Sequence, residues 1–563
     1  MLNDFEKNLL SSNVLTQDQL TTYKERAELT NTDFIEYLYD QPNIDQSKLI
    51  KVISEEYGFN TYKWDAFSRT NIPLESVDGN LVIDLGILPV NLKPNNTMQV
   101  LISHPKQINS VEALRQRNNF KIEILFAERN LIEQVISENF SIEEIKEIDF
   151  NELFEQTDDE IEDEDATTVD DENNRLVQFM NQILREGISQ KASDLHFEPL
   201  EAIYRIRFRV DGILRTVREL PKNSIKSLTN RLKVLASMDI SERRRPQDGR
   251  FRFRYNDNRV IDFRVSSLPT THGEKMVLRV LDETSAHLGI EALGFSPMQK
   301  SLYLEALHRP QGMVLITGPT GSGKTVSLYT GIGILNTPDR NISTAEDPVE
   351  INLPGISQVS MNAKTGVTFA NTLKAFLRQD PDVIMVGEIR DYETAEISIQ
   401  AAQTGHLVLS TLHTNSAAET LTRLRNMGIP AFNIATTIKL VIAQRLVRKL
   451  CSRCKTQLEI TPAIRLSLIE IGFTEVELSD PNLAIYEAVG CRACNKGYNG
   501  RVGVYEVVKI TPKISELILQ NAHAMDIENE SRKEGFVSLR QSGISKVIAG
   551  LTSVEEVMRV TSE

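Results

Sequence analysis

Apolar and basic residues alternate along two stretches in the first half of the chain. In YRIRFRV, residues 204–210, apolar side chains occupy every second position and arginines occupy the positions between them. RFRFRY, residues 250–255, repeats this pattern. Because successive side chains of a strand point to opposite faces of a sheet, both stretches predict strands with one buried face. The other face of the predicted sheet is lined with guanidinium groups.

Uninterrupted apolar stretches follow from about residue 290, each close to a loop that contains glycine, charge or histidine. They are GMVLIT (312–317), ISTAE (342–346), VIMVGE (383–388) and HLVLST (406–411). Apolar strands that alternate with helices are typical of a parallel sheet covered on both faces. The pattern therefore predicts an α/β core, and the last part of the chain, from about residue 445, is predicted to be helical.

Residues 1–150 are predicted to form a separate α/β module, and helical periodicity also predicts a helix over residues 175–188. The module's predicted helices are 15–27, 43–58, 110–117 and 129–140, and its predicted strands are 87–90 and 98–105. Nothing in the module suggests catalysis, so we expect a packing or adaptor domain.

Composition limits the classes of protein that fit. At 563 residues the chain predicts about three or four domains, since one hydrophobic core does not grow that large. The sequence has no apolar run near the roughly 18–20 residues that cross a bilayer, and its start lacks the pattern of a secretory signal. We expect a cytoplasmic protein whose membrane association comes through partners.

The acidic net charge of −15 is local. Residues 151–173 hold twelve Asp or Glu and no Lys or Arg, so the rest of the chain carries only −3. This acidic run predicts an extended linker, and the alternative is a tail that docks on a basic surface. Because the remaining parts are nearly neutral, global charge gives no argument for nucleic-acid binding.

GPTGSGKT, residues 318–325, matches the phosphate-binding loop pattern G-x-x-x-x-G-K-[ST] in full. It lies between the strand GMVLIT and the helical stretch VSLYTGIGIL, where its N–H groups and the helix N-terminus can surround phosphate oxygens. Lys324 is expected to reach the β- and γ-phosphates and Thr325 to bind Mg²⁺. No N-K-x-D motif for guanine is visible, so ATP is the expected nucleotide. The predicted ATP-binding residues are Gly318, Pro319, Thr320, Gly321, Ser322, Gly323, Lys324 and Thr325.

Acidic residues end two of the strands that follow this loop. AEDPVE carries Glu346, Asp347 and Glu350, and VGEIRD carries Glu388 and Asp391. One carboxylate can orient the attacking water and accept its proton, while another holds Mg²⁺ through its bound water. The alternative for any one of them is a helix cap or a surface charge.

Two histidines bracket the strand in GHLVLSTLHTN. His406 and His413 are too far apart for a helical metal pair. A histidine at a strand end can sense the γ-phosphate or join neighbouring subunits, and the alternative is a structural side chain.

The four cysteines form two pairs, Cys451-x-x-Cys454 and Cys491-x-x-Cys494, separated by 36 residues. Two such knuckles supply four thiolates for a tetrahedral structural Zn²⁺. Disulfides are not expected in a reducing cytoplasm, and redox chemistry would need only one pair.

Taken together, GPTGSGKT, ISTAEDPVE, FLRQDPDVIMVGEIRD and TGHLVLSTLHTN resemble the Walker A, Asp-box, Walker B and His-box motifs of the secretion ATPases that drive type II secretion and type IV pili. RFRVDG, RRRPQDGRFRF and DFRVSSLPTTHGEKMVLR resemble the domain before the ATPase core. The resemblance covers about residues 170–563 and, weakly, the N-terminal module. It implies a homohexamer that binds nucleotide between subunits and powers pilus assembly through an inner-membrane platform protein (PilC-like), with possible contacts to other pilus assembly proteins.

The resemblance also implies residue roles. Glu346 matches the general base of the Asp box, and Glu388 matches the glutamate that holds Mg²⁺ through water. Arginines of the preceding domain would stabilise charge on the transferring phosphoryl group, and the matching ones are Arg207, Arg209, Arg264 and Arg279. His406 and His413 complete the predicted catalytic set. The tetracysteine site is similar to that of assembly-type members of the family.

The expected fold class is α/β: a RecA-like core preceded by a small α/β (PAS-like) domain and an N-terminal α/β module, with a C-terminal helical zinc-binding part. The expected boundaries are 1–150 for the N-terminal module, 151–173 for the linker, 174–288 for the arginine-rich domain, 289–450 for the core, 451–494 for the zinc segment and 495–563 for the C-terminal helices.

Two other functions remain open. A type II secretion ATPase would use the same chemistry on different cargo. A nucleic-acid translocase is disfavoured because the folded parts are near neutral and stacking aromatics are absent beside the basic sheet. Cyclic di-GMP binding by the N-terminal module is not expected, since FEKNLLSSNVL stands where family members carry an R-L-G-type opening.

Overall fold

The computed structural model describes most of the chain and divides it into two compact units, residues 1–163 and 164–563. The described residues are 4–29, 33–39, 41, 44–64, 67–68, 71–73, 82, 85–93, 96–108, 111, 121–139, 175–256, 259–281, 289–481, 483–491 and 494–561. The predicted linker, residues 151–173, and nearly all of the predicted helix 110–117 lie outside them. No helix among the described residues is long and apolar enough to cross a bilayer.

The first unit is an α/β module. Four helices come first: α1 (Asp4–Ser11), α2 (Gln17–Leu29), α3 (Phe34–Tyr39) and α4 (Gln46–Tyr57). A four-stranded sheet has the order β1 (Asn60–Thr61), β4 (Lys121–Phe126), β3 (Thr97–Ile102), β2 (Leu88–Lys93), and α7 (Arg129–Asn139) follows. Buried aliphatic residues from these elements form one core, as the predicted helices and strands require.

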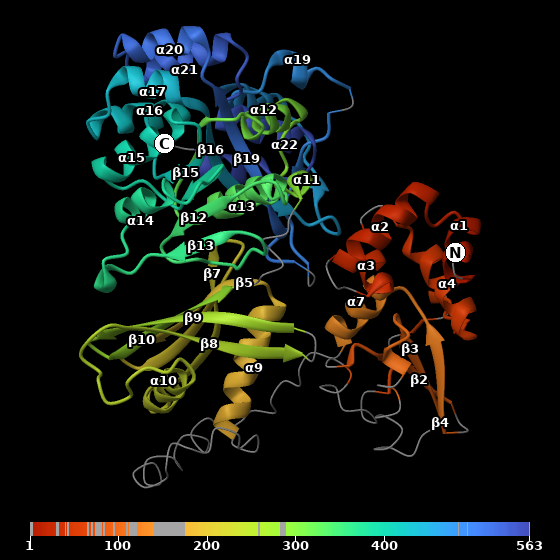
Figure 1. Cartoon of the computed structure of the whole chain (residues 1–563). Coiled ribbons are helices and arrows are strands. Elements are labelled where there is room, and N and C mark those ends of the chain that lie inside the picture. The colour runs from red at the N-terminus through yellow and green to blue at the C-terminus, as the bar shows by residue number, and fades with distance from the viewer. Residues whose placement is uncertain are drawn as a thin grey trace. The chain divides into compact units, whose positions relative to one another are not determined.

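The second unit begins with α9 (Arg175–Ser189) and an antiparallel sheet, coloured yellow to green in Figure 1. The strand order is β7 (Ile213–Pro221), β6 (Ile203–Val210), β5 (Ala192–Pro199), β10 (Gly273–Leu281), β9 (Arg259–Thr270), β8 (Gln247–Asn256), and α10 (Ser224–Leu235) lies against it. Along β6 every second residue is buried, which confirms the period-two prediction. We call residues 175–281 the arginine domain.

A seven-stranded sheet forms the core of the second unit. Its order is β13 (Ser357–Ser360), β12 (Ile342–Glu346), β14 (Val383–Val386), β15 (Leu407–Leu412), β11 (Gly312–Thr317), β16 (Ile438–Leu450), β19 (Tyr498–Lys509). All neighbours are parallel except β16 and β19. The four apolar stretches predicted as parallel strands are therefore confirmed.

Helices cover both faces of this sheet (Figure 1). One face packs against α11 (Ile290–Leu293), α12 (Pro297–Leu307) and α13 (Lys324–Leu335). The other packs against α14 (Phe369–Phe376), α15 (Tyr392–Gln403), α16 (Ala417–Asn426) and α17 (Ala431–Thr437). Because alternate residues of β11 enter the two clusters, the strand that leads into the phosphate loop is fixed from both sides.

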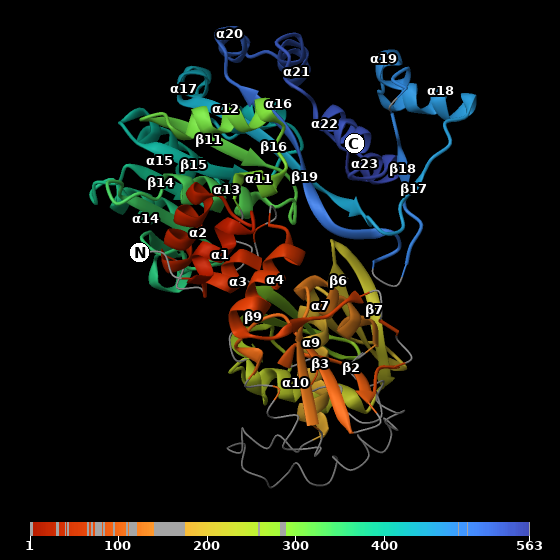
Figure 2. The ribbon, with the colours of Figure 1, turned by 90° about the vertical axis from the view of Figure 1, so that its right-hand side faces the viewer.

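The C-terminal part differs from the expected helical segment. Residues 445–450 continue β16, and residues 498–509 form β19, which pairs with β16 along nearly its whole length (Figure 2). Six helices and a two-stranded sheet complete this part: α18 (Pro462–Ile471), α19 (Glu475–Leu478), α20 (Pro512–Leu519), α21 (Ala524–Lys533), α22 (Leu539–Ile548), α23 (Val554–Thr561), β17 (Thr456–Gln457) and β18 (Tyr486–Glu487). The helical prediction is confirmed for these helices and wrong for residues 445–450 and 498–509. The stretch 498–509 contains two glycines and gives a weak strand signal, but it pairs along a buried strand of the core.

Candidate nucleotide site and tetracysteine cluster

The phosphate loop joins β11 to α13 at the carboxyl edge of the parallel sheet. Gly318, Gly321 and Gly323 have positive φ angles of 150°, 79° and 86°, which other residues adopt only with strain. Lys324 begins α13, and its Nζ donates hydrogen bonds to the carbonyl oxygens of Gly318 (2.8 Å) and Pro319 (3.1 Å). The lysine therefore lies over the loop, next to its exposed residues 319–321.

The surroundings of Lys324 change its acid–base behaviour. Burial disfavours the ammonium ion and lowers its pKa to about 8, against the opposing charge of Glu388. Arg445 adds to the lowering. An anion placed on the loop would reverse this effect, because it favours the charged form of the lysine.

Glu346 is buried at the end of β12, with 4% of its surface exposed. Both carboxylate oxygens accept hydrogen bonds. Tyr329 Oη donates to Oε2 (2.5 Å), while Thr344 Oγ1 (2.6 Å) and Gln358 Nε2 (3.1 Å) donate to Oε1. Burial and this carboxylate raise the pKa of Tyr329, so its hydroxyl stays protonated and remains a donor. The geometry is that of a carboxylate held inside a polar network.

Glu350 lies in the loop after β12 and is more accessible. Its side chain is 29% exposed and pairs with Arg264 Nη1 at 2.8 Å. Arg264 Nη2 also donates to the carbonyl oxygen of Val349. Among the four predicted arginines, Arg264 is the one whose described contacts connect the arginine domain with the Asp-box loop.

Glu388 follows β14 with one glycine between them. A Cβ on Gly387 would lie 3.2 Å from the carbonyl oxygen of Ala345, so the close approach of β12 favours glycine. The Glu388 carboxylate pairs with Arg390 and lies 3.3 Å from His413 Nε2. Walker B and His-box residues therefore meet in one site.

The remaining acids of these motifs have local roles. Asp391 caps α15 by accepting a hydrogen bond from the N–H of Thr394 (2.8 Å). Asp347 lies 3.9 Å from Arg390, beside the Glu388 pair.

His406 is not brought to the nucleotide site. It lies before β15, whereas His413 follows it, and a six-residue strand spans roughly 20 Å. His406 Nδ1 lies 2.8 Å from the carbonyl oxygen of Ala401, at the end of α15. This contact matches the structural alternative for that histidine.

The other three predicted arginines are paired within their own sheet. Arg207 bonds Glu198 at 2.7 Å, and Arg279 bonds Asp194 at 3.2 Å. Arg209 lies 3.7 Å from Asp194 and donates to the carbonyl oxygen of Gly212 (2.9 Å). Although burial opposes it, bonds from Arg207 and Lys275 lower the pKa of Glu198 to about 2. These cations are therefore held on one face by two carboxylates.

The four cysteines form one cluster. β16 ends just before Cys451 and β19 begins shortly after Cys494, so the antiparallel pair brings both knuckles together. All four sulfur atoms lie within 4.8 Å of one another, with separations of 3.6 Å for Cys454–Cys494 and 3.9 Å for Cys451–Cys491. A tetrahedron with 2.3 Å zinc–sulfur bonds has sulfur–sulfur edges of about 3.8 Å. The donor set fits a structural Zn²⁺.

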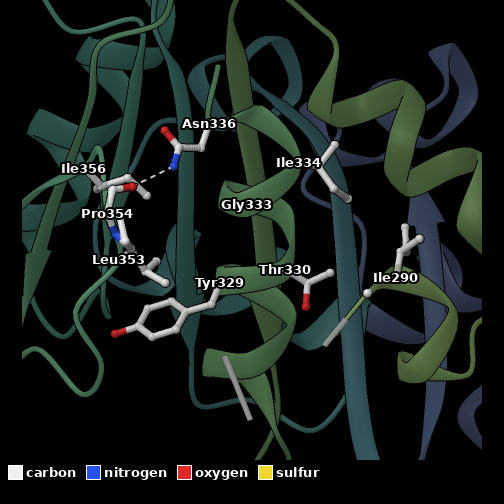
Figure 3. Close-up of a pocket in the computed structure, with 10 residues that line it drawn as sticks. Ile290, Tyr329, Thr330, Gly333, Ile334, Asn336, Leu353, Pro354 and Ile356 are labelled. Atoms are coloured by element: carbon white, nitrogen blue, oxygen red, sulfur yellow. Dashed lines mark hydrogen bonds between the residues drawn. The ribbon is translucent and has the colours of Figure 1, made fainter. Parts of the chain in front are cut away.

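A cavity of about 330 Å³ lies beside α13 (Figure 3). Its polar lining groups are already bonded. Asn336 Nδ2 donates to the carbonyl oxygen of Pro354, and Thr330 Oγ1 donates to that of Val326. The Tyr329 hydroxyl is engaged by Glu346. The cavity offers no convergent donors, so we assign it no ligand.

Four residues that the motifs do not contain take part in the site. Tyr329 and Gln358 hold Glu346, while Gln444 and Arg445 contact the phosphate loop and the His-box loop. Only Gln444 has a sequence feature that could have indicated its role, and this feature is weak. A glutamine inside the apolar run LVIAQRLV is unusual for a buried strand.

Comparisons with known sequences match nearly the whole chain. The family model described as "Type II/IV secretion system protein" matches residues 169–559. The "Type IV pilus assembly ATPase PilB" of Acinetobacter baylyi is 49% identical, covering 99% of this chain and 96% of its own. The protein of the same name from Pseudomonas aeruginosa is 45% identical, covering 100% and 99%. The "Type II secretion system protein E" of Aeromonas hydrophila is 44% identical, covering 71% and 78%.

Among solved structures, the X-ray structure of the Legionella pneumophila ATPase DotB is similar to 68% of this chain and 95% of its own, with 23% sequence identity and a TM-score of 0.50. At this identity the likeness concerns the fold alone.

Proposed function

The chain belongs to the type II/IV secretion system protein family, and on this premise we propose that it hydrolyses ATP to power the assembly of type IV pili. The proposal rests on one observation: a complete phosphate loop follows an interior strand of the core sheet, in a chain that aligns over 99% of its length with a pilus assembly ATPase. The product of the reaction is ADP and phosphate.

We propose that the loop residues 318–325 bind ATP, with Lys324 at the β- and γ-phosphates. Thr325 and Glu388 would hold Mg²⁺, which neutralises charge on the phosphates when it is bound. His413 Nε2 lies 3.3 Å from Glu388 and would orient that carboxylate.

The general base is proposed to be a carboxylate of the Asp box. Glu346 was the candidate from the motif, but its oxygens accept three hydrogen bonds within a buried network. Glu350 is partly exposed and paired only with Arg264 among its described contacts, so it is better placed to meet a water. Turnover of the variants Glu350→Gln and Glu346→Gln distinguishes the two candidates.

We propose that Arg207, Arg209, Arg264 and Arg279 form the surface that stabilises charge on the transferring phosphoryl group, in a ring of six subunits. The small α/β domain that carries them would be PAS-like. His406 is proposed to have a structural role in this arrangement.

The partners follow from the proposed function. We propose a cytoplasmic protein that associates with the inner membrane through a platform protein, with neither nucleic acid nor cyclic di-GMP as a ligand. Zn²⁺ on the four cysteines would fix the ends of β16 and β19. Type II secretion is the second candidate, because relatives with that name share the core at 44–45% identity.

Complementation tests the cargo. A pilus-deficient PilB deletion strain is given the wild-type gene or the Lys324→Ala variant, and surface pili are counted. We expect pili with the wild type and almost none with the variant at equal protein level. Restored type II secretion without pili in the matching secretion mutant would favour the second candidate instead.

A further inference from the structure

Gln444 is a buried polar residue in the middle of β16, with 1% of its surface exposed. Its Nε2 donates to the carbonyl oxygen of Ser322 at 2.8 Å, and its Oε1 accepts from Ser327 Oγ at 2.8 Å. Ser322 lies two residues before Lys324, and Ser327 lies three residues after it. The amide group of Gln444 therefore connects β16 to a residue on each side of Lys324.

The loop is also in close contact with this residue at two glycines. A Cβ on Gly318 would lie 2.5 Å from the Gln444 carbonyl oxygen, and a Cβ on Gly323 would lie 2.9 Å from Gln444 Nε2. Neither position tolerates a side chain while Gln444 stays where it is. The glycines of the motif thus serve the approach to β16 as well as the loop's own conformation.

The bond to Ser322 determines where a backbone N–H points. In a planar trans peptide, the carbonyl of one residue and the N–H of the next point in opposite directions. Holding the Ser322 carbonyl toward β16 turns the Gly323 N–H away from the strand. Phosphate loops bind their ligand with N–H groups that point into one concave surface.

A neutral amide supplies both bonds, whereas an ionised carboxylate or an aliphatic side chain does not. The Ser322 carbonyl oxygen accepts from the amide nitrogen of Gln444, and the Ser327 hydroxyl donates to its amide oxygen. A carboxylate would place an acceptor against the carbonyl and a negative charge behind the phosphate site. An aliphatic side chain would leave both groups unpaired.

We propose that Gln444 is a positioning residue that holds the phosphate loop in its ligand-binding form. This inference rests on the proposed function, since it takes the ligand to be a nucleoside triphosphate. Gln444 touches no phosphate itself and acts through Ser322, Gly323 and Ser327.

The test compares the same isosteric change at two buried glutamines in the full-length chain. Gln444→Glu removes the donor to Ser322. The matched control is Gln299→Glu, because Gln299 is 7% exposed and its Nε2 donates to the Tyr505 carbonyl oxygen (2.8 Å), away from the loop. Binding of a fluorescent ATP analogue with Mg²⁺ is titrated, and thermal melting checks folding. We expect the Kd to rise at least tenfold for Gln444→Glu and to stay within twofold of the wild type for Gln299→Glu.

The pH dependence separates positioning from a general loss of structure. A protonated carboxyl can donate to the Ser322 carbonyl oxygen, and burial raises the pKa of a carboxyl group. The affinity deficit of Gln444→Glu, expressed as a ratio to the wild type, should therefore shrink from pH 8 to pH 6. A ratio that stays constant would contradict the proposed bond.

The remaining outcomes are decisive as well. If Gln444→Glu does not fold, Ser327→Ala removes the second bond alone, and we expect a Kd three- to tenfold above the wild type. Wild-type affinity in Ser327→Ala or in Gln444→Glu would overturn the positioning role. A loss of affinity in Gln299→Glu as large as that in Gln444→Glu would also overturn it. A wild-type chain that does not bind the analogue overturns the proposed function instead.

Discussion

Three carboxylates of the Asp-box and Walker B motifs have different surroundings, which give them different chemistry. Glu346 is buried and bonded by Tyr329, Thr344 and Gln358, whereas Glu350 is partly exposed beside Arg264. Glu388 faces His413. The Glu346 carboxylate already accepts three hydrogen bonds and is 4% exposed, so a water has little access to it, whereas the Glu350 side chain is 29% exposed. Accessibility therefore favours Glu350 as the base.

The paired variants Glu350→Gln and Glu346→Gln test this assignment. In Glu350→Gln we expect kcat for ATP to fall by about 10²–10⁴-fold, the usual contribution of a positioned base, with an unchanged melting temperature. In Glu346→Gln we expect a loss of about 1–3 kcal/mol of stability, because buried hydrogen bonds to a charged acceptor are lost. Steady-state turnover and thermal melting measure the two effects. Normal turnover in Glu350→Gln, with a large loss in a fully stable Glu346→Gln, would reverse the assignment.

The pKa of Lys324 predicts a pH dependence of nucleotide binding. In the free chain the pKa is lowered to about 8, so the lysine loses its charge as the pH rises through that value. A bound triphosphate favours the charged form, so binding takes up a proton above pH 8. Affinity should therefore fall between pH 8 and 9.5, measured by calorimetry in buffers of different ionisation enthalpy. The Lys324→Ala variant is the control, and its weaker affinity should change little over that range.

Among individual residues, the sequence predicted those whose positions are determined by the spacing of a motif. The loop lysine, Glu388, His413 and the four cysteines are of this kind, but the contact between Glu388 and His413 was not predicted. The partners of Glu346 were not predictable, because Tyr329 lies 17 residues before it and Gln358 lies 12 residues after it. Only the packing of α13 and β13 around β12 brings them together.

The long strand β16 connects the phosphate loop, the His-box loop and the cysteine cluster. Gln444 bonds the phosphate loop, Arg445 Nη2 lies 3.2 Å from the carbonyl oxygen of Asn415, and Cys451 follows the strand directly. The sequence placed a helical segment here from about residue 445. The pairing of β16 with β19 could not be predicted from the sequence pattern, because the paired residues lie about 60 positions apart in the chain.

Cys494→Ser tests the cluster as a support for this strand pair. If the wild type carries the proposed Zn²⁺, which would link the ends of β16 and β19, we expect the variant to lose it and to melt at a lower temperature. Zinc is quantified by a colorimetric chelator after unfolding. Ser452→Ala, an exposed position between Cys451 and Cys454, is the control and should retain both metal and stability. A chain that carries no zinc when purified from zinc-replete cells would contradict the assignment.

Within the second unit, described contacts join the arginine domain to the core at Arg264 and at Asp211. Arg264 reaches the Asp-box loop, and Asp211 accepts a hydrogen bond from the N–H of Gly500 at 3.0 Å, near the start of β19. The β6–β7 turn therefore lies against the strand that leaves the cysteine cluster. The period-two arginine pattern predicted the sheet, but which arginine faces the core depends on how the two domains pack.

Arg264→Ala tests that contact against a matched arginine of the same sheet. We expect kcat for ATP to fall at least tenfold, because the Asp-box loop loses its cationic partner. Arg252→Ala is the control, since Arg252 is 77% exposed and pairs only with Asp262 among its described contacts. Equal turnover in the two variants would show that Arg264 has no special place in the site.

ATP turnover by the purified, zinc-replete full-length chain and its Lys324→Ala variant, assayed as phosphate release with Mg²⁺, tests whether this loop supports ATP hydrolysis. We expect steady hydrolysis by the wild type and a loss of at least 100-fold in the variant, which should keep the wild-type melting temperature. Absence of turnover in a correctly folded, oligomeric wild type, or equal turnover in both proteins, would contradict this expectation.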